Sequence, residues 1–414
     1  MSWSAGTTRE TSPQRSASAA SIIRPVRIMS MALALRRVGV HADVFEQAAE
    51  LREVGSGLTV WAGAIRALEQ LGIAERVLSQ SSKTERFEVR TSTGRRLSTA
   101  PLFRLEPKLG VPAGVVIHRA DLLRELASGL DESDIHCGAR CVSIENGTDA
   151  VLARFADGWQ ASADFLVGAD GLHSVVRSQL HGTSKPRYAG YTCWRGLAHL
   201  DVKDPPPGLG FETWGPGARF SVQHCGPGRI FWWASRNVSE GGVDSPAGRK
   251  ADVRDIFRGW PSPIPEIIEA TPGAGILRND MLDRLPLKDW GRGRVTLLGD
   301  AAHPTTPNLG EGAGMAIEDA VCLAAILTEV REVQAALRHY EQSRFPRTTA
   351  ITRNSWRLGR LCQWENPFGC WLRNRLTRWT PSAISLRMME NRVNYALPQL
   401  SGSSGSPAAA SVRF

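Results

Sequence analysis

One carboxylate followed by a glycine-rich segment is the strongest chemical signal in the sequence. Residues 295–298 form a short apolar run that predicts a buried strand, and Gly299 and Asp300 follow directly. Two prolines stiffen the next loop, and the glycine-spaced residues 310–314 open a predicted helix. Open α/β sheets bind ligands at the carboxyl ends of their strands, and helix N-termini attract electron-rich groups. The stretch therefore predicts a ligand site at Asp300, with an ordinary strand–loop–helix connection as the alternative.

Two more acids stand at predicted strand ends. Residues 29–38 predict a helix closed by Gly39, and the strand after it ends at Glu46. A helix, a strand and a terminal acid form the later half of a dinucleotide-binding βαβ unit, so Glu46 is a candidate for the ribose hydroxyls. Asp170 likewise follows the apolar residues 165–167 and precedes a predicted helix.

The earlier half of this βαβ unit lacks its usual glycines. A G-x-G-x-x-G loop would begin about twenty residues before the acid. Its glycines would fall near Ile23, Pro25 and Ile28, and none of these is glycine. Two explanations remain open: a gene-model or frame error at the N-terminus, or a true variant with weakened cofactor binding.

Several segments together resemble one family. GDAAHPTTPNLGEGAGMAIEDA, GADGLHSVVR, REVGSG, HRADL and YTCWRG look like motifs of the class A FAD-dependent monooxygenases, the aromatic hydroxylases. The resemblance spans roughly residues 29–380. It implies an α/β fold, in which a Rossmann-like FAD-binding domain is split by an inserted, mostly-β substrate domain and followed by C-terminal helices.

The resemblance also implies roles for particular residues. Arg195, in YTCWRG, would face flavin and substrate as a fixed cation, which makes it the catalytic candidate. An arginine paired with a carboxylate of the sheet is the alternative. The implied cofactor-binding residues are Glu46, Gly57, Arg119, Asp170, Asp300, Gly312, Ala313 and Gly314.

The activity implied by the resemblance consumes NADH or NADPH and O2. The nicotinamide cofactor would reduce FAD, O2 would add at flavin C4a, and the hydroperoxide would pass one oxygen to a small aromatic or polycyclic hydrophobic substrate. An isoprenoid epoxidase of the same fold and a non-catalytic paralogue with impaired FAD binding are the alternatives. The substrate, the choice between NADH and NADPH, and the oligomeric state stay open.

Composition excludes other classes of protein. The 414 residues contain 42% hydrophobic and 22% charged residues, as in an ordinary globular protein. The net charge of +9 is spread along the chain without a nucleic-acid-binding motif, so we expect anionic small molecules rather than nucleic acid as partners. Seven scattered cysteines without a C-x-x-C pair predict no metal site and no disulfide framework, and a cytoplasmic location.

The order of patterns predicts the domain organisation. A hairpin turning at Thr93 and Gly94 falls inside the first half of the cofactor domain. The predicted segments are a disordered or aberrant leader (1–28), a discontinuous FAD-binding domain (29–182 and 276–335), a β-sheet substrate domain (183–275), C-terminal helices (336–397) and a disordered tail (398–414).

Tryptophans raise two further questions. Trp214, Trp232 and Trp233 lie on predicted strands, either lining an aromatic pocket or filling the core of the sheet. Residues 364–379 combine bulky apolar residues with arginine. That segment predicts either weak contact with an anionic membrane surface or a packed helix pair with basic outer faces.

Overall fold

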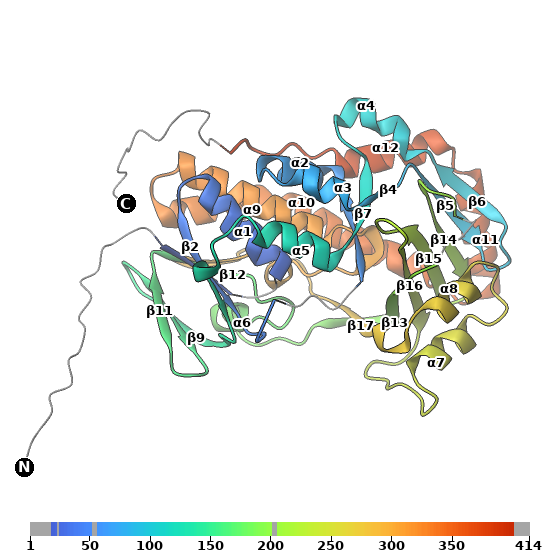
Figure 1. Cartoon of the computed structure of the whole chain (residues 1–414), viewed down its shortest axis with the longest axis horizontal. Coiled ribbons are helices and arrows are strands. Elements are labelled where there is room, and N and C mark those ends of the chain that lie inside the picture. The colour runs from blue at the N-terminus through green and yellow to red at the C-terminus, as the bar shows by residue number, and fades with distance from the viewer. Residues whose placement is uncertain (1–17, 23–24, 52–55, 201–204, 401–414) are drawn as a thin grey trace, which may run out of the picture.

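Two large β-sheets joined by long helices make up the protein (Figure 1). The computed structural model describes residues 18–22, 25–51, 56–200 and 205–400. The first sheet has five parallel strands in the order β18-β12-β1-β2-β8. Their bounds are β1 Ser18–Ile22, β2 His41–Glu46, β8 Ile135–Cys137, β12 Phe165–Gly168 and β18 Val295–Leu297.

Helices and a small sheet cover the two faces of this parallel sheet (Figure 1). The helical face carries α1 Pro25–Arg37, α5 Arg119–Ala127 and α9 Gly312–Glu329. The other face carries the antiparallel strands β9 Cys141–Asn146, β10 Val151–Phe155 and β11 Gln160–Ala163, with α6 Val175–His181 beside them. Phe155 packs on Phe45 of β2 with ring centroids 4.7 Å apart, so one hydrophobic core holds both layers together.

The sequence-based boundary of the leader is wrong. β1 and the start of α1 fall within the predicted leader 1–28, yet β1 lies between β2 and β12 at the centre of the sheet. The serine- and alanine-rich composition hid a strand that hydrogen-bonds on both sides. The predicted helix 29–38, strand 165–167 and strand 295–298 are confirmed within one to four residues. Ile23 of the G-x-G-x-x-G window lies outside the described residues.

The second sheet has seven strands in the order β17-β13-β16-β15-β14-β5-β6. It is wider than the predicted segment 183–275: β17, after that segment, forms one edge, and the hairpin β5–β6 joins the other edge through parallel pairing of β5 with β14. The hairpin itself is confirmed, with Gly94 at φ +85° in its turn. The bounds are β5 Arg86–Thr91, β6 Arg96–Ala100, β13 Arg187–Ala198, β14 Leu209–Gly215, β15 Ala218–His224, β16 Ile230–Asn237 and β17 Leu277–Asp283.

Shorter elements complete the frame. The three-stranded sheet β3-β7-β4 lies between the two large sheets. Its strands and the short helices of the chain are β3 Gly57–Trp61, β4 Ser82–Lys83, β7 Gly114–His118, α2 Ala62–Gln70, α3 Ala74–Ser79, η1 Leu102–Leu105, α4 Glu106–Leu109, η2 Glu132–Asp134, α7 Arg249–Ile256, α8 Ile264–Ala270, η3 Gly273–Gly275, η4 Gly299–Ala301 and η5 Pro307–Leu309.

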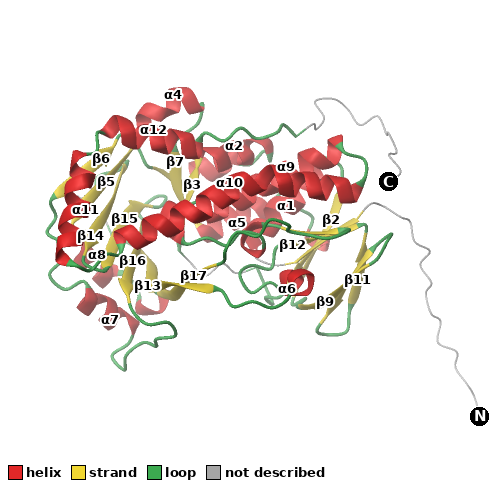
Figure 2. Ribbon diagram, turned by 180° about the vertical axis from the view of Figure 1, so that it is seen from behind, coloured by secondary structure: helices red, strands yellow, loops and turns green. Residues whose placement is uncertain are grey.

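The C-terminal helices bridge the two halves. Figure 2 shows α10 (Val333–Cys362) running from the parallel sheet to the seven-stranded sheet, with α11 (Pro367–Trp379) and α12 (Ser382–Val393) beyond it. The tail predicted from residue 398 begins as ordered chain, because Gln70 donates to the Pro398 carbonyl and accepts from the Leu400 amide. Residues 401–414 of that prediction lie outside the described residues. No described helix has the length and apolar character needed to cross a membrane.

Candidate active site

A cavity of about 250 Å³ is lined by both large sheets. Asp300 and the loop that leads to α9 come from the parallel-sheet half. Arg195, on β13, and Phe231 and Trp233, on β16, come from the seven-stranded sheet. The parallel-sheet contribution follows the carboxyl end of β18, where α/β folds bind ligands.

Six of the nine predicted site residues meet at this cavity. They come from five separate parts of the chain, so the fold converts scattered motifs into one site. These lining residues are Gly57, Arg119, Arg195, Asp300, Gly312 and Ala313. Trp233 lines the cavity as well, whereas Trp232 is fully buried and donates its indole N–H to Thr271 in the sheet core.

Three predicted site residues lie elsewhere. The Asp170 carboxylate accepts hydrogen bonds from the Val175 and Val176 amides at 2.6 and 3.1 Å, so it caps α6. Glu46 is buried at the end of β2 and accepts from the Ala48 amide at 2.8 Å. Gly314 packs α9 on α2: an added Cβ would stand 3.3 Å from Cβ of Ala64. Asp170, Glu46 and Gly314 therefore have structural contacts and are not among the residues that line the cavity.

The most important lining residue that the sequence motifs did not predict is Arg27. This arginine of α1 is 6% exposed and forms an ion pair with Asp300. It stands inside the window where the family motif has glycines, and the spacing of that motif makes predictions about glycines alone. The available signal for Arg27 was a positive charge within the window where a phosphate-binding loop is expected.

Arg195 is held by a neighbouring strand. Its guanidinium donates to the Asn279 side chain of β17 at 2.6 Å, and none of the described residues accepts a hydrogen bond from its buried Nε. Within the described part of the chain, the side-chain partner of Arg195 is this amide and not the sheet carboxylate of the predicted alternative. The side chain is therefore a fixed cation at the cavity wall.

The loop before α9, which contains Pro304 and Pro307, is hydrogen-bonded to the seven-stranded sheet. Asn308 donates to the Tyr191 hydroxyl at 2.8 Å and accepts from Arg219 at 2.5 Å. Arg219 is fully buried and lies 5.0 Å from the centroid of the Trp233 ring. These contacts hold the loop before α9 against the wall that carries Trp233.

Behind the cavity, a buried ionic network fixes the start of α9. His303 approaches Asp319 at 2.7 Å, and Arg344 donates to the same carboxylate at 2.7 Å. Burial opposes ionisation of Asp319, but His303 and Arg344 lower its pKa to about 2. Asp319 therefore stays charged, and His303 serves as a structural partner of that carboxylate.

The residues present fit a flavin cofactor. The N-terminus of α9 presents its first amides beside Gly312, and its first turn contains no acidic side chain. Gly310 adopts φ +64°, and an added Cβ would stand 3.3 Å from the Trp61 indole nitrogen, so the loop needs glycine there. Three arginines face a single lining acid, Asp300, among the described residues, which suits an electron-rich, phosphate-bearing ligand.

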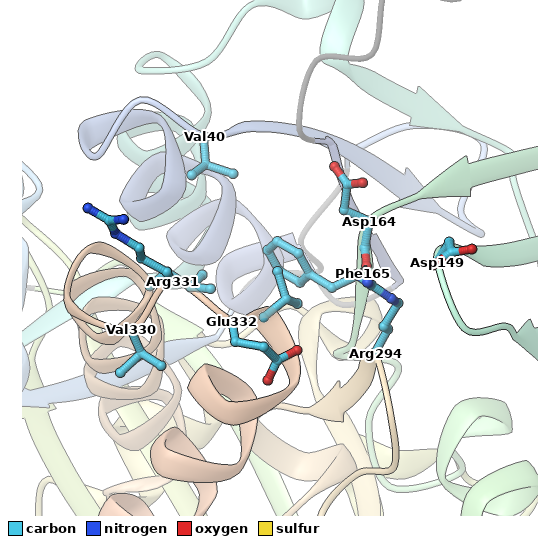
Figure 3. A pocket seen from close by; sticks show the side chains of 10 residues that line it. Val40, Asp149, Asp164, Phe165, Arg294, Val330, Arg331 and Glu332 are labelled. Carbon is cyan, nitrogen blue, oxygen red and sulfur yellow. Dashed lines mark hydrogen bonds between the residues drawn. The ribbon is translucent and has the colours of Figure 1, made fainter. Parts of the chain in front are cut away.

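A second cavity, of about 390 Å³, lies at the other edge of the parallel sheet. Figure 3 shows it between Phe165 on one side and Val330 and Arg331 on the other. Phe165 begins β12, and Arg294 immediately precedes β18, so this cavity stands at the amino ends of the strands. The edge at which α/β folds bind ligands is the opposite one, which favours the cavity at Asp300 as the ligand site.

A further group of possible metal ligands lies at the edge of the parallel sheet. His41, Asp43 and Asp134 offer ligand atoms within 4.8 Å of one another. His41 pairs with Asp134 at 3.3 Å, and His136 pairs with Asp43 at 3.4 Å. These contacts between histidine and aspartate side chains hold the cluster together.

Comparison with known proteins agrees with this geometry. A family model described as an FAD binding domain matches residues 29–198 and 280–355. Aurachin C monooxygenase/isomerase of Stigmatella aurantiaca is 39% identical over 354 residues, covering 86% of this chain and 92% of that protein. A 2-heptyl-3-hydroxy-4(1H)-quinolone synthase of Pseudomonas aeruginosa is 33% identical over 375 residues, covering 89% and 96%.

A solved structure shows the same architecture. Klebsiella pneumoniae HpxO, crystallised with FAD and uric acid, superposes with a TM-score of 0.86 at 28% identity, over 94% of this chain and 98% of that one. Three observations support the same family: the sequence matches, the split FAD-binding region and the cavity between the two sheets. The chain belongs to the class A FAD-dependent monooxygenases, the aromatic hydroxylase family.

Proposed function

We propose that the protein inserts one oxygen atom of O2 into a small aromatic or polycyclic hydrophobic substrate at the expense of NADH or NADPH. The observation that carries this proposal is the shared cavity, where Asp300 and the N-terminus of α9 face Arg195 and Trp233. One wall suits a flavin, and the other suits a flat apolar molecule with a polar group. Family membership supplies the class of reaction.

The substrate class is narrowed by the relatives. The name of the Pseudomonas relative specifies a 3-hydroxylated 4(1H)-quinolone with an alkyl chain. The substrate wall of this chain contains Phe231, Trp233 and Cys193 beside the Arg195 cation. Aromatic and apolar groups next to one cation suit a ring system with an acidic or carbonyl oxygen. An alkylated 4(1H)-quinolone is therefore the first probe to use.

The protein residues divide the work between binding and orientation. FAD, when bound, supplies the activation of O2. Asp300 would accept hydrogen bonds from the sugar-alcohol hydroxyls of FAD, and the α9 amides would stabilise negative charge on the flavin. Arg195 orients the substrate through its polar oxygen and stabilises the charge that develops there. Phe231 and Trp233 exclude water from the reacting face.

Arg195→Ala tests this assignment. With 2-heptyl-4(1H)-quinolone as probe, we expect substrate-stimulated NAD(P)H oxidation to fall about 100-fold while FAD stays bound, because one fixed cation is lost. Arg236→Ala, on β16 and outside the cavity lining, is the matched control and should retain the wild-type rate. An unchanged rate in Arg195→Ala would remove this arginine from the active site.

An isoprenoid epoxidase remains the second candidate. The chloroplastic zeaxanthin epoxidase of Nicotiana plumbaginifolia is 35% identical over 342 residues, but this chain covers only 51% of that protein. The aurachin and quinolone relatives are matched over nearly their whole length, so they support the aromatic substrate better. NAD(P)H oxidation stimulated by a carotenoid, and not by any aromatic probe, would reverse this preference.

We also propose that α11 contacts an anionic membrane surface, from which a lipophilic substrate would enter. Its apolar residues point outward: Phe368 is 68% exposed and Trp379 is 65% exposed. With Trp371 and Leu376 they follow helical spacing along one face, and Arg375 lies 4.8 Å from the Trp379 ring centroid. An exposed aromatic face with arginines suits the membrane interface.

A reducing compartment, the cytoplasm, is the location we propose. All seven cysteines are free; Cys137 is exposed and the other six are buried. Formation of native disulfides during purification without reductant, detected by intact mass, would argue against it.

A further inference from the structure

The N-terminus of α1 lies beside the cofactor cavity. α1 connects β1 to the parallel neighbour β2, so its first turn stands at the carboxyl end of β1. The first amides of a helix lack partners within the helix, and the first turn of α1 contains no acidic side chain to satisfy them. In a dinucleotide-binding βαβ unit this is the position of a diphosphate, although here the usual glycines are absent.

Arg27 provides an independent sign of an anionic ligand. The side chain is 6% exposed, lines the cavity, and pairs through one terminal nitrogen with Asp300. Its other terminal nitrogen, Nη1, is buried and finds no hydrogen-bond acceptor among the described residues. Buried guanidinium N–H groups are costly to leave unpaired, so this donor is suited to an anionic oxygen.

The surroundings of Arg27 hold its side chain in this position. Gly299 has φ +59°, and an added Cβ would stand 2.8 Å from Cδ of Arg27, so the arginine stem occupies space that only glycine leaves. Asp300 fixes the guanidinium plane through the ion pair. A carboxylate has about four lone-pair sites, so Asp300 can also accept from a hydroxyl of the ligand without releasing Arg27.

We propose that Arg27 binds the diphosphate of FAD, and that its side-chain charge replaces part of the amide cradle of the absent glycine loop. The inference rests on the proposed function, since it assumes that FAD is the ligand. Asp300 positions Arg27, and Arg27 presents Nη1 to a phosphate oxygen in a charge-assisted hydrogen bond. In this proposal, the charge of Arg27 explains how the chain binds the FAD diphosphate without a G-x-G-x-x-G loop.

Flavin binding by the full-length chain tests the proposal directly. Dissociation constants for FAD and riboflavin are measured by fluorescence quenching on wild type, Arg27→Ala and Arg27→Lys. We expect Arg27→Ala to weaken FAD binding about tenfold or more and to leave riboflavin binding within about twofold, because riboflavin has no phosphate. Arg27→Lys keeps the charge and should recover part of the FAD affinity.

A control on the same helix separates the local effect from helix damage. Arg36→Ala removes an exposed arginine that pairs with Asp131, and its FAD affinity should equal that of wild type. Thermal melting of each variant checks folding, and Arg27→Lys provides the readout if Arg27→Ala does not fold.

Several outcomes would overturn the proposal. Equal FAD affinity in Arg27→Ala and wild type would show that Arg27 does not touch the diphosphate. Tighter FAD binding in Arg27→Ala would show that Arg27 competes with FAD for Asp300. In both cases FAD still binds and the proposed function stands. Absence of flavin binding in every variant, wild type included, would instead remove the proposed function together with this inference.

Discussion

Glu311 is the residue with the clearest predicted response to pH. It stands directly before α9, is 2% exposed, and has its carboxyl group 3.4 Å from Arg392 of α12. Burial raises its pKa to about 7, although Arg392 opposes the shift. Burial likewise lowers the pKa of Arg392, so both members of this pair lose hydration in the fold.

Glu311→Gln should remove a pH dependence of stability. As the pH rises, the unfolded state loses the Glu311 proton at about pH 4.5, whereas the folded state keeps this proton until about pH 7. Wild type is therefore favoured below pH 4.5 and loses stability as the pH rises to about 7. Relative to wild type, the unfolding free energy of the variant should increase by about 3 kcal/mol between pH 4.5 and pH 8, measured by urea unfolding.

An exposed carboxylate provides the control for this experiment. Glu145 pairs with Arg154 at the surface, and Glu145→Gln should shift stability equally little at both pH values. If the difference in unfolding free energy between Glu311→Gln and wild type does not change with pH, Glu311 has an ordinary pKa in the fold.

At the scale of residues, the sequence predicted those parts of the site that stand in motifs. Asp300 follows an apolar strand, and Arg195 falls in a segment resembling the family, so residue type and neighbours sufficed to predict two residues that line the cavity. Their roles there stay predictions. Arg27 could not be predicted in this way, because its partner Asp300 is 273 residues away. Asp170 was predicted as a ligand because it follows a strand. A carboxylate at a strand end can equally cap the next helix, and Asp170 caps α6.

At the scale of elements, the position of α9 depends on the buried carboxylate of Asp319. Asp319 binds His303 and Arg344, and it also accepts from the Gly299 amide at 3.2 Å. Asp319→Asn would leave Arg344 with one charged partner, Glu318. We expect a loss of about 3–5 kcal/mol in the free energy of unfolding, because a buried ion pair is broken without replacement.

Chemical denaturation measures this loss, with Glu145→Gln again as the exposed control, expected to cost about 0–1 kcal/mol. The same variant should also bind FAD more weakly, since the network fixes Gly299 and the start of α9 beside the cavity. A cost of Asp319→Asn no larger than that of the surface control would show that the network does not hold α9.

The elements also show where sequence patterns stop being informative. Alternation predicted the hairpin at residues 85–99, but alternation identifies a strand and not its partner. β5 pairs with β14, more than 110 residues later, and moves the hairpin into the substrate sheet. β1 was missed for the opposite reason: its short serine- and alanine-rich sequence carries no apolar pattern, and its neighbours β2 and β12 define it as a strand.

For the whole molecule, the outward face of α11 predicts binding to anionic lipid. The double variant Trp371→Ala/Trp379→Ala should bind vesicles of phosphatidylcholine and phosphatidylglycerol at least about tenfold more weakly than wild type, because two interfacial side chains are lost. Sedimentation with the vesicles measures this binding, and Trp159→Ala, at another exposed tryptophan, is the control. Equal binding by the double variant and the control would contradict the proposed membrane contact.

The flavin content of the purified full-length chain tests the central claim most directly. After equilibration with FAD and removal of free ligand, denatured wild-type protein should release about one FAD per chain, since both sheets line the cavity at Asp300. Asp300→Ala should release about a tenth of this amount or less, because the variant loses the carboxylate that pairs with Arg27 and that we propose binds the cofactor. A wild-type chain that releases no FAD after this equilibration, or an Asp300→Ala variant that retains a full equivalent, would contradict the account.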